Sequence, residues 1–179
     1  MYRHSARWRS VAPILMGLSL SACVTRWAQQ AEPHWVRRGE GLFWDTTAVY
    51  GVGMSTPADV RPVKVLKQAA DLRVRAQIRA AIDTYVDQLF QEAGFEDQAA
   101  ASAEEMRSVS AAVLSEGSVV QRWIDPFSGT VYALFRVDRG RIPRAIMTAE
   151  RIGEIDRQHL AAQADAVFER LRQQGEPWR

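Results

Sequence analysis

The sequence predicts an α+β domain in which a small antiparallel sheet of about three strands is packed by a long helix, with a shorter helix and a C-terminal helix. Three observations lead to this class. Apolar residues alternate along residues 48–54, which is typical of a strand. They recur every three or four positions from residue 63 to about residue 93, which indicates a long helix. Two β-rich runs, residues 119–124 and 131–137, flank a connection with proline and glycine and predict a hairpin.

The first strand contains two glycines, Gly51 and Gly53, which invite comparison with a dinucleotide-binding loop. That loop needs a third glycine and a helix that begins at once, whereas Pro57 and Pro62 intervene here. We therefore expect no cofactor. The glycines are expected instead to make room for a helix that crosses the strand closely.

The long helix is predicted to begin at Pro62, which suits a first turn, and to end before Gly94. One face is apolar, with Leu66, Ala70, Val74, Ile78, Ile82, Tyr85 and Leu89. The opposite face is charged, with Lys64, Asp71, Arg75, Arg79, Asp83 and Asp87. Charge pairs at helical spacing are typical of a solvated helix face, so we do not assign them to catalysis.

The rest of the predicted domain, residues 42–179, contains a shorter helix over residues 103–115, the hairpin and a C-terminal helix from about residue 143. Gly153 weakens that helix near its middle. On the last strand, Tyr132 and Leu134 lie opposite the apolar face. Their side of the sheet is expected to be covered by the C-terminal helix.

The first 22 residues differ in character from the rest of the chain. Arginines at positions 3, 7 and 9 precede an uncharged run over residues 11–20. This run is much shorter than the roughly 20 residues that a membrane-spanning helix needs. It is followed by four residues that resemble the lipobox read by lipoprotein-processing enzymes, namely Leu20, Ser21, Ala22 and Cys23.

The lipobox resemblance implies that residues 1–22 are a lipoprotein signal peptide, that the Cys23 sulfur receives a diacylglyceryl group, that cleavage precedes Cys23 and that the new amino group is acylated. Two or three acyl chains anchor a protein stably to a membrane. A buried or catalytic thiol is the alternative, but neither His34 nor His159 stands in a recognisable cysteine-hydrolase context. Val24 and Thr25 follow the cysteine where an aspartate would retain the protein in the inner membrane, so the resemblance points to the outer membrane.

Residues 23–41 are expected to form a tether between the membrane and the domain, because they mix charges, Pro33 and glycines without a period. Two tryptophans stand out in this segment. Trp27 and Trp35 either dock on the domain or lie among lipid headgroups, where tryptophan is frequent.

Charge and composition argue against several classes of function. Of the 23 Lys and Arg residues, three precede Cys23, so 20 face 21 Asp and Glu once the signal is removed. This balance, with no dense basic patch, argues against nucleic-acid binding. The sequence shows no metal-ligand spacing and no catalytic arrangement of histidines or carboxylates, so we expect a protein that is not an enzyme. A small-ligand-binding protein or enzyme of the cell envelope is the alternative.

Several residues of the predicted elements form a recognisable pattern, namely Gly51 and Gly53 at the strand end, Arg75 and Ala76 in the long helix, and Trp123, Asp125 and Tyr132 in the hairpin. With these residues the domain resembles the Lpp-twenty family of bacterial lipoproteins. Val74 departs from the family pattern, which usually has alanine there. The resemblance implies a non-enzymatic outer-membrane lipoprotein that acts through protein partners or self-association, with flagellum-associated proteins among its relatives. Trp123 is expected to pack in the core, and Asp125 is expected to cap the turn.

Overall fold

The computed structural model describes residues 31–57, 62–95 and 101–174. It has a four-stranded antiparallel sheet in the order β1-β2-β4-β3, formed by β1 (Gly41–Trp44), β2 (Ala48–Ser55), β3 (Ser118–Ile124) and β4 (Val131–Asp138). The helices of the described residues are α1 (Val63–Glu92), α2 (Ala101–Ser115), α3 (Ile142–Met147) and α4 (Glu154–Gln173), with a 3-10 turn η1 (Arg139–Arg141) before α3. The predicted α+β class with a long helix is confirmed.

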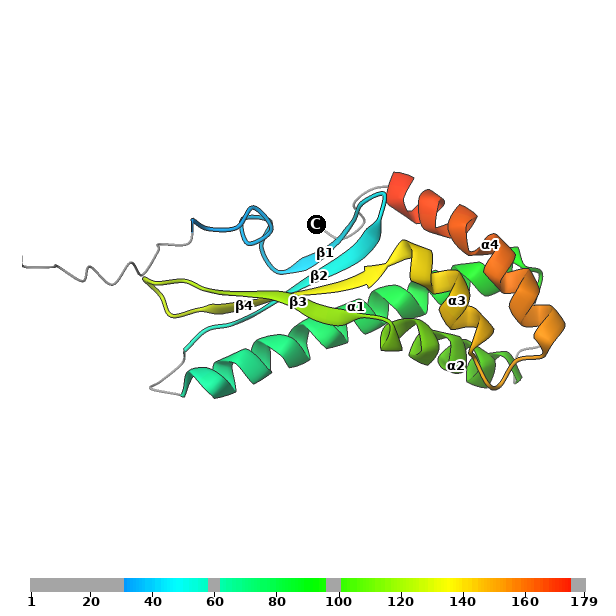
Figure 1. Ribbon diagram of the computed structural model, residues 1–179, viewed down its shortest axis with the longest axis horizontal. Coiled ribbons are helices and arrows are strands. Elements are labelled where there is room, and N and C mark those ends of the chain that lie inside the picture. Colours follow the sequence, from blue (N-terminus) through cyan, green and yellow to red (C-terminus); the bar gives the residue numbers. More distant parts are fainter. Residues whose placement is uncertain (1–30, 58–61, 96–100, 175–179) are drawn as a thin grey trace, which may run out of the picture.

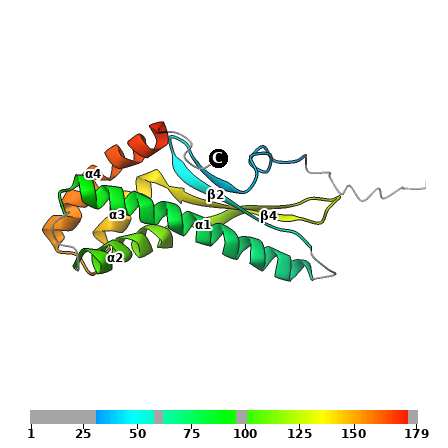
Figure 2. The same ribbon diagram turned by 180° about the vertical axis from the view of Figure 1, so that it is seen from behind.

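Helix α1 crosses one face of the sheet and continues past it (Figure 1). Its first half packs only on the sheet, whereas α2, α3 and α4 gather around its second half. The molecule is therefore elongated, with the β3–β4 turn and the start of α1 at one end and the three shorter helices at the other (Figure 2). The main core lies between the sheet, α1 and these helices.

The end of α1 is fixed by its sequence. Gly94 adopts a φ of 78°, which glycine accepts without strain. The Gly94 N–H donates to the Gln91 carbonyl and the Phe95 N–H donates to the Phe90 carbonyl, each with an N···O distance of 3.1 Å. The Phe90 and Phe95 rings also pack, with centroids 5.6 Å apart. These contacts form a Schellman motif that ends the helix where the sequence predicts.

The sheet contains one strand more than predicted. Strand β1 has only four residues, which is too short to show a clear alternation. It is held by a tight connection in which Asp45 Oδ1 accepts hydrogen bonds from the Thr47 and Ala48 backbone N–H groups, at 2.7 and 2.8 Å. Since β1 begins at Gly41 and the residues before it pack on the sheet, the segment expected to be a tether, residues 23–41, partly belongs to the domain.

The prediction for the second face of the sheet was wrong. Leu134 and Val52 on this face are covered by Trp35 and Val36 from the N-terminal arm, which form a small separate core with Trp123. The C-terminal helix packs on the opposite side, where the Tyr85 hydroxyl donates a 2.9 Å hydrogen bond to the α4 carbonyl of Ala164. Sequence periodicity cannot tell which face an amphipathic segment will cover, because that depends on tertiary packing.

The predicted C-terminal helix is also two helices. Residues 148–153 separate α3 from α4, and Gly153 is the N-cap of α4 instead of an interior residue. Glu154 and Asp156 then lie in the first turn of α4, where negative charge is favourable. The glycine therefore marks a helix start.

Candidate functional site

The two motif glycines lie where α1 crosses β2. A Cβ atom on Gly53 would stand 2.5 Å from the Val74 backbone nitrogen and 2.6 Å from the Ala70 carbonyl oxygen. On Gly51 it would stand 3.0 Å from Val74 Cγ2. The glycines thus let the helix backbone approach the strand directly, and they leave no cradle for a phosphate at this point. Val74, the departure from the family pattern, is fully buried in this crossing.

Arg75 and Ala76 follow Val74 and are exposed on α1. The Arg75 guanidinium carbon lies 5.2 Å from the centroid of the buried Phe135 ring of β4, which is cation–π geometry. Ala76 lies about 100° further round the helix, given 3.6 residues per turn. The structure therefore does not bring these two motif residues together with those of the hairpin.

Trp123 and Tyr132 are cross-strand partners on the second face of the sheet, with ring centroids 5.6 Å apart. Trp35 joins them from the arm, and its Nε1–H donates a 2.6 Å hydrogen bond to Gln121 Oε1. Trp123 is therefore a packing residue of the second core. The Trp35 contact was one of two alternatives left open by the sequence, and the structure places this side chain on the domain.

Asp125 organises the hairpin turn. Its Oδ1 accepts the Phe127 N–H at 2.9 Å and its Oδ2 accepts the Ser128 hydroxyl at 2.5 Å. The hydrogen bond from Ser128, followed by the one from Phe127, holds the pKa of the Asp125 carboxyl below its usual value. Gly129 has a φ of 70° and completes the turn.

Phe43 and Tyr50 form an aromatic stack on the second face that the sequence did not predict. The rings of Phe43 and Tyr50 are parallel within 10° with centroids 4.8 Å apart. Arg38 lies over Phe43 at 4.7 Å and Arg136 lies over Tyr50 at 5.7 Å. The two rings are direct partners in the β1–β2 hairpin, so recognising β1 would have revealed the stack.

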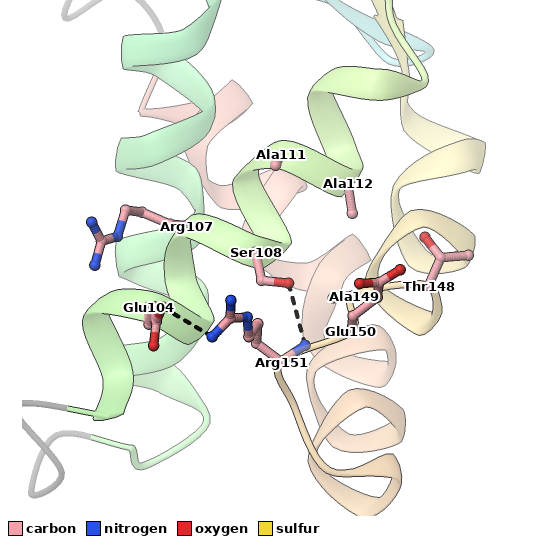
Figure 3. A pocket seen from close by; sticks show the side chains of 9 residues that line it. All are labelled: Glu104, Arg107, Ser108, Ala111, Ala112, Thr148, Ala149, Glu150 and Arg151. Carbon is pink, nitrogen blue, oxygen red and sulfur yellow. Dashed lines mark hydrogen bonds and ion pairs between the residues drawn. The ribbon is translucent and has the colours of Figure 1, made fainter.

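The first surface recess, of about 500 Å³, lies between α2 and the segment joining α3 to α4 (Figure 3). Glu104 pairs with Arg151 across it at 3.0 Å, and the Arg151 N–H donates to Ser108 Oγ at 3.5 Å. The paired side chains are more than half exposed. Arg107 points away from the pair (Figure 3). The recess is wide open, and its ion pair is of the exposed kind that contributes little energy.

A second recess, of about 610 Å³, lies where β4 leads through η1 into α3. It is lined by four arginines, namely Arg136 of β4, Arg139 and Arg141 of η1, and Arg144 of α3. Most of this positive charge is already matched. Arg139 pairs with Asp165 at 2.7 Å and Glu169 at 3.3 Å, while Arg141 pairs with Glu116 at 3.4 Å. Arg136 also pairs with Asp138. The recess is therefore a network of ion pairs between elements.

The first half of α1 has an apolar strip facing away from the sheet. Leu72 is 68% exposed, and Val65 and Ala76 lie on the same side of the helix. Arg75 and Arg79 follow Leu72 by three and seven positions, which places positive charge beside the strip. We refer to Val65, Leu72 and Ala76 as the α1 strip.

At the other end of the molecule, Ile155 at the start of α4 is 82% exposed. Acidic side chains surround it in the sequence, with Glu150 just before the helix and Glu154 and Asp156 on either side. Arg151 and Arg157 belong to the same stretch, but Arg151 pairs with Glu104 and Arg157 donates a hydrogen bond to the Ala149 carbonyl. The carboxylates on either side of Ile155 therefore give it a more acidic setting than that of Leu72, which is followed by arginines.

Strand β3 is one edge of the sheet. Its pairing with β4 is interrupted by a register shift between Val119 and Gln121. Arg122 points toward α1, where its guanidinium makes two hydrogen bonds to the Asp71 carboxylate, at 2.9 and 2.6 Å. Bulges and inward-pointing charges are devices that discourage a further strand from pairing with an edge.

Within the described ranges, no group of three or more His, Cys, Asp or Glu side chains is placed to hold a metal ion. No helix among the described residues combines the length and apolarity needed to cross a membrane. Cys23, predicted from the sequence to be lipidated, and the predicted lipobox residues Leu20, Ser21 and Ala22 lie outside the described residues. No family model matches the chain, and a search of curated proteins finds no match.

Proposed function

We propose that this protein is a lipoprotein of the bacterial outer membrane, anchored through acyl chains on Cys23, and that its domain is a non-enzymatic assembly module facing the periplasm or the cell surface. The lipobox-like sequence Leu20, Ser21, Ala22, Cys23 supports the anchor. The resemblance to the Lpp-twenty family supports the assembly role and extends it to flagellum-associated structures.

The observation that carries the assembly role is the uncovered α1 strip. The second half of α1 is enclosed by α2 and α4, but Leu72 in the first half stands 68% exposed with apolar neighbours along the helix. Exposed apolar surface bordered by charge is characteristic of protein interaction sites. The β3 edge is a weaker candidate because its bulge and the inward-pointing Arg122 oppose strand addition.

The two halves of the molecule complement each other. Leu72 lies beside arginines in the first half of α1, and Ile155 lies between acidic residues at the start of α4. Helix α4 lies at the end of the molecule opposite the β3–β4 turn (Figure 1). Opposite charges around two apolar anchors favour contact between the α1 strip of one copy and the Ile155 region of the next. Such a contact joins different surfaces of two copies, so repetition produces rings or filaments.

The test is the mass of the purified, lipidated protein by light scattering in detergent. The native protein is expected to be larger than a monomer, whereas Leu72→Glu and Ile155→Lys are each expected to be monomeric. An equal mixture of the two variants should form dimers only, because one intact strip and one intact Ile155 region remain. A monomeric native protein, or dimers from either variant alone, would contradict this arrangement.

A further inference from the structure

The turn between β3 and β4 presents an aromatic side chain to solvent. Phe127 at its tip is 93% exposed, and Pro126 beside it is exposed as well. Ile124 at the end of β3 is another partly exposed apolar residue. An apolar group of this size in water contributes nothing to the fold, because it buries no surface against the domain.

The turn does not need an apolar residue at position 127. Its geometry depends on the Asp125 carboxylate, on the positive φ of Gly129, and on backbone hydrogen bonds from Asp125 to Thr130 and from Gly129 to Asp125, each 2.9 Å long. Phe127 contributes only its backbone N–H. The turn thus fixes the position of the Phe127 backbone, while its ring adds no packing to the domain.

The position of the turn indicates what the ring can reach. The N-terminal arm enters the domain at the same end as the β3–β4 turn, and both views show this (Figures 1 and 2). Eight residues separate Cys23 from Glu32, the second described residue. At most they span about 30 Å, since an extended chain covers about 3.5 Å per residue.

The far end of the molecule is held less closely. Helix α1 has 30 residues and is about 45 Å long at 1.5 Å per residue. An arm of about 30 Å keeps the turn end within that distance of the membrane, whereas the α3–α4 end approaches the membrane only if the domain tips over. The turn end is therefore the end held beside the bilayer.

We propose that the β3–β4 turn docks on the lipid bilayer that holds Cys23, with the Phe127 ring entering the boundary between headgroups and acyl chains. This inference rests on the proposed lipid anchor. Aromatic side chains are favoured at that depth, about 5 to 10 Å into the interface. Pro126 and Ile124, the nearest apolar residues before the ring in the sequence, are exposed as well.

The polar groups of the turn already have hydrogen-bond partners within the turn. The Asp125 carboxylate already accepts the Phe127 N–H and the Ser128 hydroxyl, and Ser128 Oγ lies 2.8 Å from Thr130 Oγ1. These groups keep their partners when water is displaced from the turn, so docking leaves few hydrogen-bonding groups unpaired. Docking also turns the α3–α4 end away from the membrane, so a head-to-tail contact with its Ile155 region involves a copy whose turn is not docked on the same bilayer.

The test uses the lipidated protein in vesicles of phosphatidylethanolamine and phosphatidylglycerol, with some lipids carrying a nitroxide high on the acyl chain. A fluorophore is attached at Pro126→Cys, which keeps Phe127, or at the exposed Ala103→Cys in the first turn of α2, as a control at the opposite end that leaves Ile155 unchanged. Thioether-linked Cys23 does not react with the label. Quenching at Pro126→Cys is expected to exceed that at Ala103→Cys at least about twofold, because nitroxide quenching requires close approach and the turn lies at the interface.

Adding Phe127→Ser to the Pro126→Cys protein is expected to reduce its quenching to the control level. Thermal unfolding should stay unchanged, because Phe127 is almost fully exposed. Two results would overturn the docking if the protein floats with the vesicles: equal quenching at the two ends, or quenching that Phe127→Ser does not change. In both cases the lipid anchor would stand. Protein that does not float and whose Cys23 thiol reacts with the label overturns the anchor as well.

Discussion

Gly53 and Val74 approach so closely that a Cβ atom on Gly53 would stand 2.5 Å from the Val74 backbone nitrogen. Both residues belong to regular elements, so the strand or the whole helix would have to move to relieve the clash. The crossing of α1 over β2 therefore requires a residue without a Cβ atom at position 53.

Gly53→Ala is expected to lower the free energy of unfolding by about 2 to 3 kcal/mol, which is typical of overpacking in a rigid core. The matched control is Gly140→Ala, because a Cβ there meets no heavy atom within 4 Å. Urea denaturation of both variants measures the effect. Equal stability of the two would show that the helix can shift away from the strand.

The second core depends on Trp35, which is only 3% exposed. Trp35→Ala is expected to cost about 3 kcal/mol of unfolding free energy, since a large buried ring is removed. Trp35→Phe retains an aromatic ring but loses the hydrogen bond to Gln121, so its cost should be smaller, with about 1 kcal/mol from that bond. If denaturation were unaffected by Trp35→Ala, the arm would not be part of the cooperative fold.

Stability at low pH is expected to depend on Glu169. Hydrogen bonds from Arg172 and Gln173, followed by the positive charges of Arg172 and Arg139, lower the pKa of Glu169 from 4.5 to about 2. Because the folded pKa is below the unfolded one, these contacts stabilise the fold above pH 4.5, and this contribution disappears as the pH falls toward 2. Glu169→Gln should therefore be less stable than the native protein at pH 6 but not near pH 2. A stability difference that stays constant over this range would contradict the assignment.

Membrane anchoring is tested by Cys23→Ser. The precursor is expected to retain residues 1–22 and to be absent from the outer-membrane fraction, since serine has no thiol to receive the diacylglyceryl group. Ser21→Ala is the control, because it keeps a small residue at that lipobox position and should be processed normally. Mass spectrometry of the N-terminal peptide distinguishes the forms. A processed and anchored Cys23→Ser protein would exclude lipidation at this residue.

The sequence predicted the elements whose signals are local. The period of α1, the stop at Gly94 and the turn residues Asp125 and Gly129 all act within a few positions of the backbone they shape. The contact of the two β2 glycines with α1 was also predictable, because Gly51 and Gly53 are two positions apart and so share one face of the strand, where the lack of side chains indicates a close neighbour.

The features that the sequence did not reveal depend on contacts between distant segments. Trp35 covers the second sheet face through Gln121, which is 86 positions away, and no local pattern encodes that choice. The sequence shows the side of α1 opposite its apolar face mainly as charged. The exposure of Leu72 and Val65 on that side is evident only once the neighbours of α1 are known. Gly153 is equally ambiguous, since glycine tolerates both a helix interior and a helix start.

The uneven enclosure of α1 has a consequence for its dynamics. Amide hydrogens in residues 78–90, surrounded by α2, α4 and the sheet, are expected to exchange with solvent only through large-scale opening. The first turns after Val63 pack on the sheet alone and open at lower free energy. One continuous helix thus combines a slowly exchanging half with a more adaptable half, and Leu72 lies on the adaptable one.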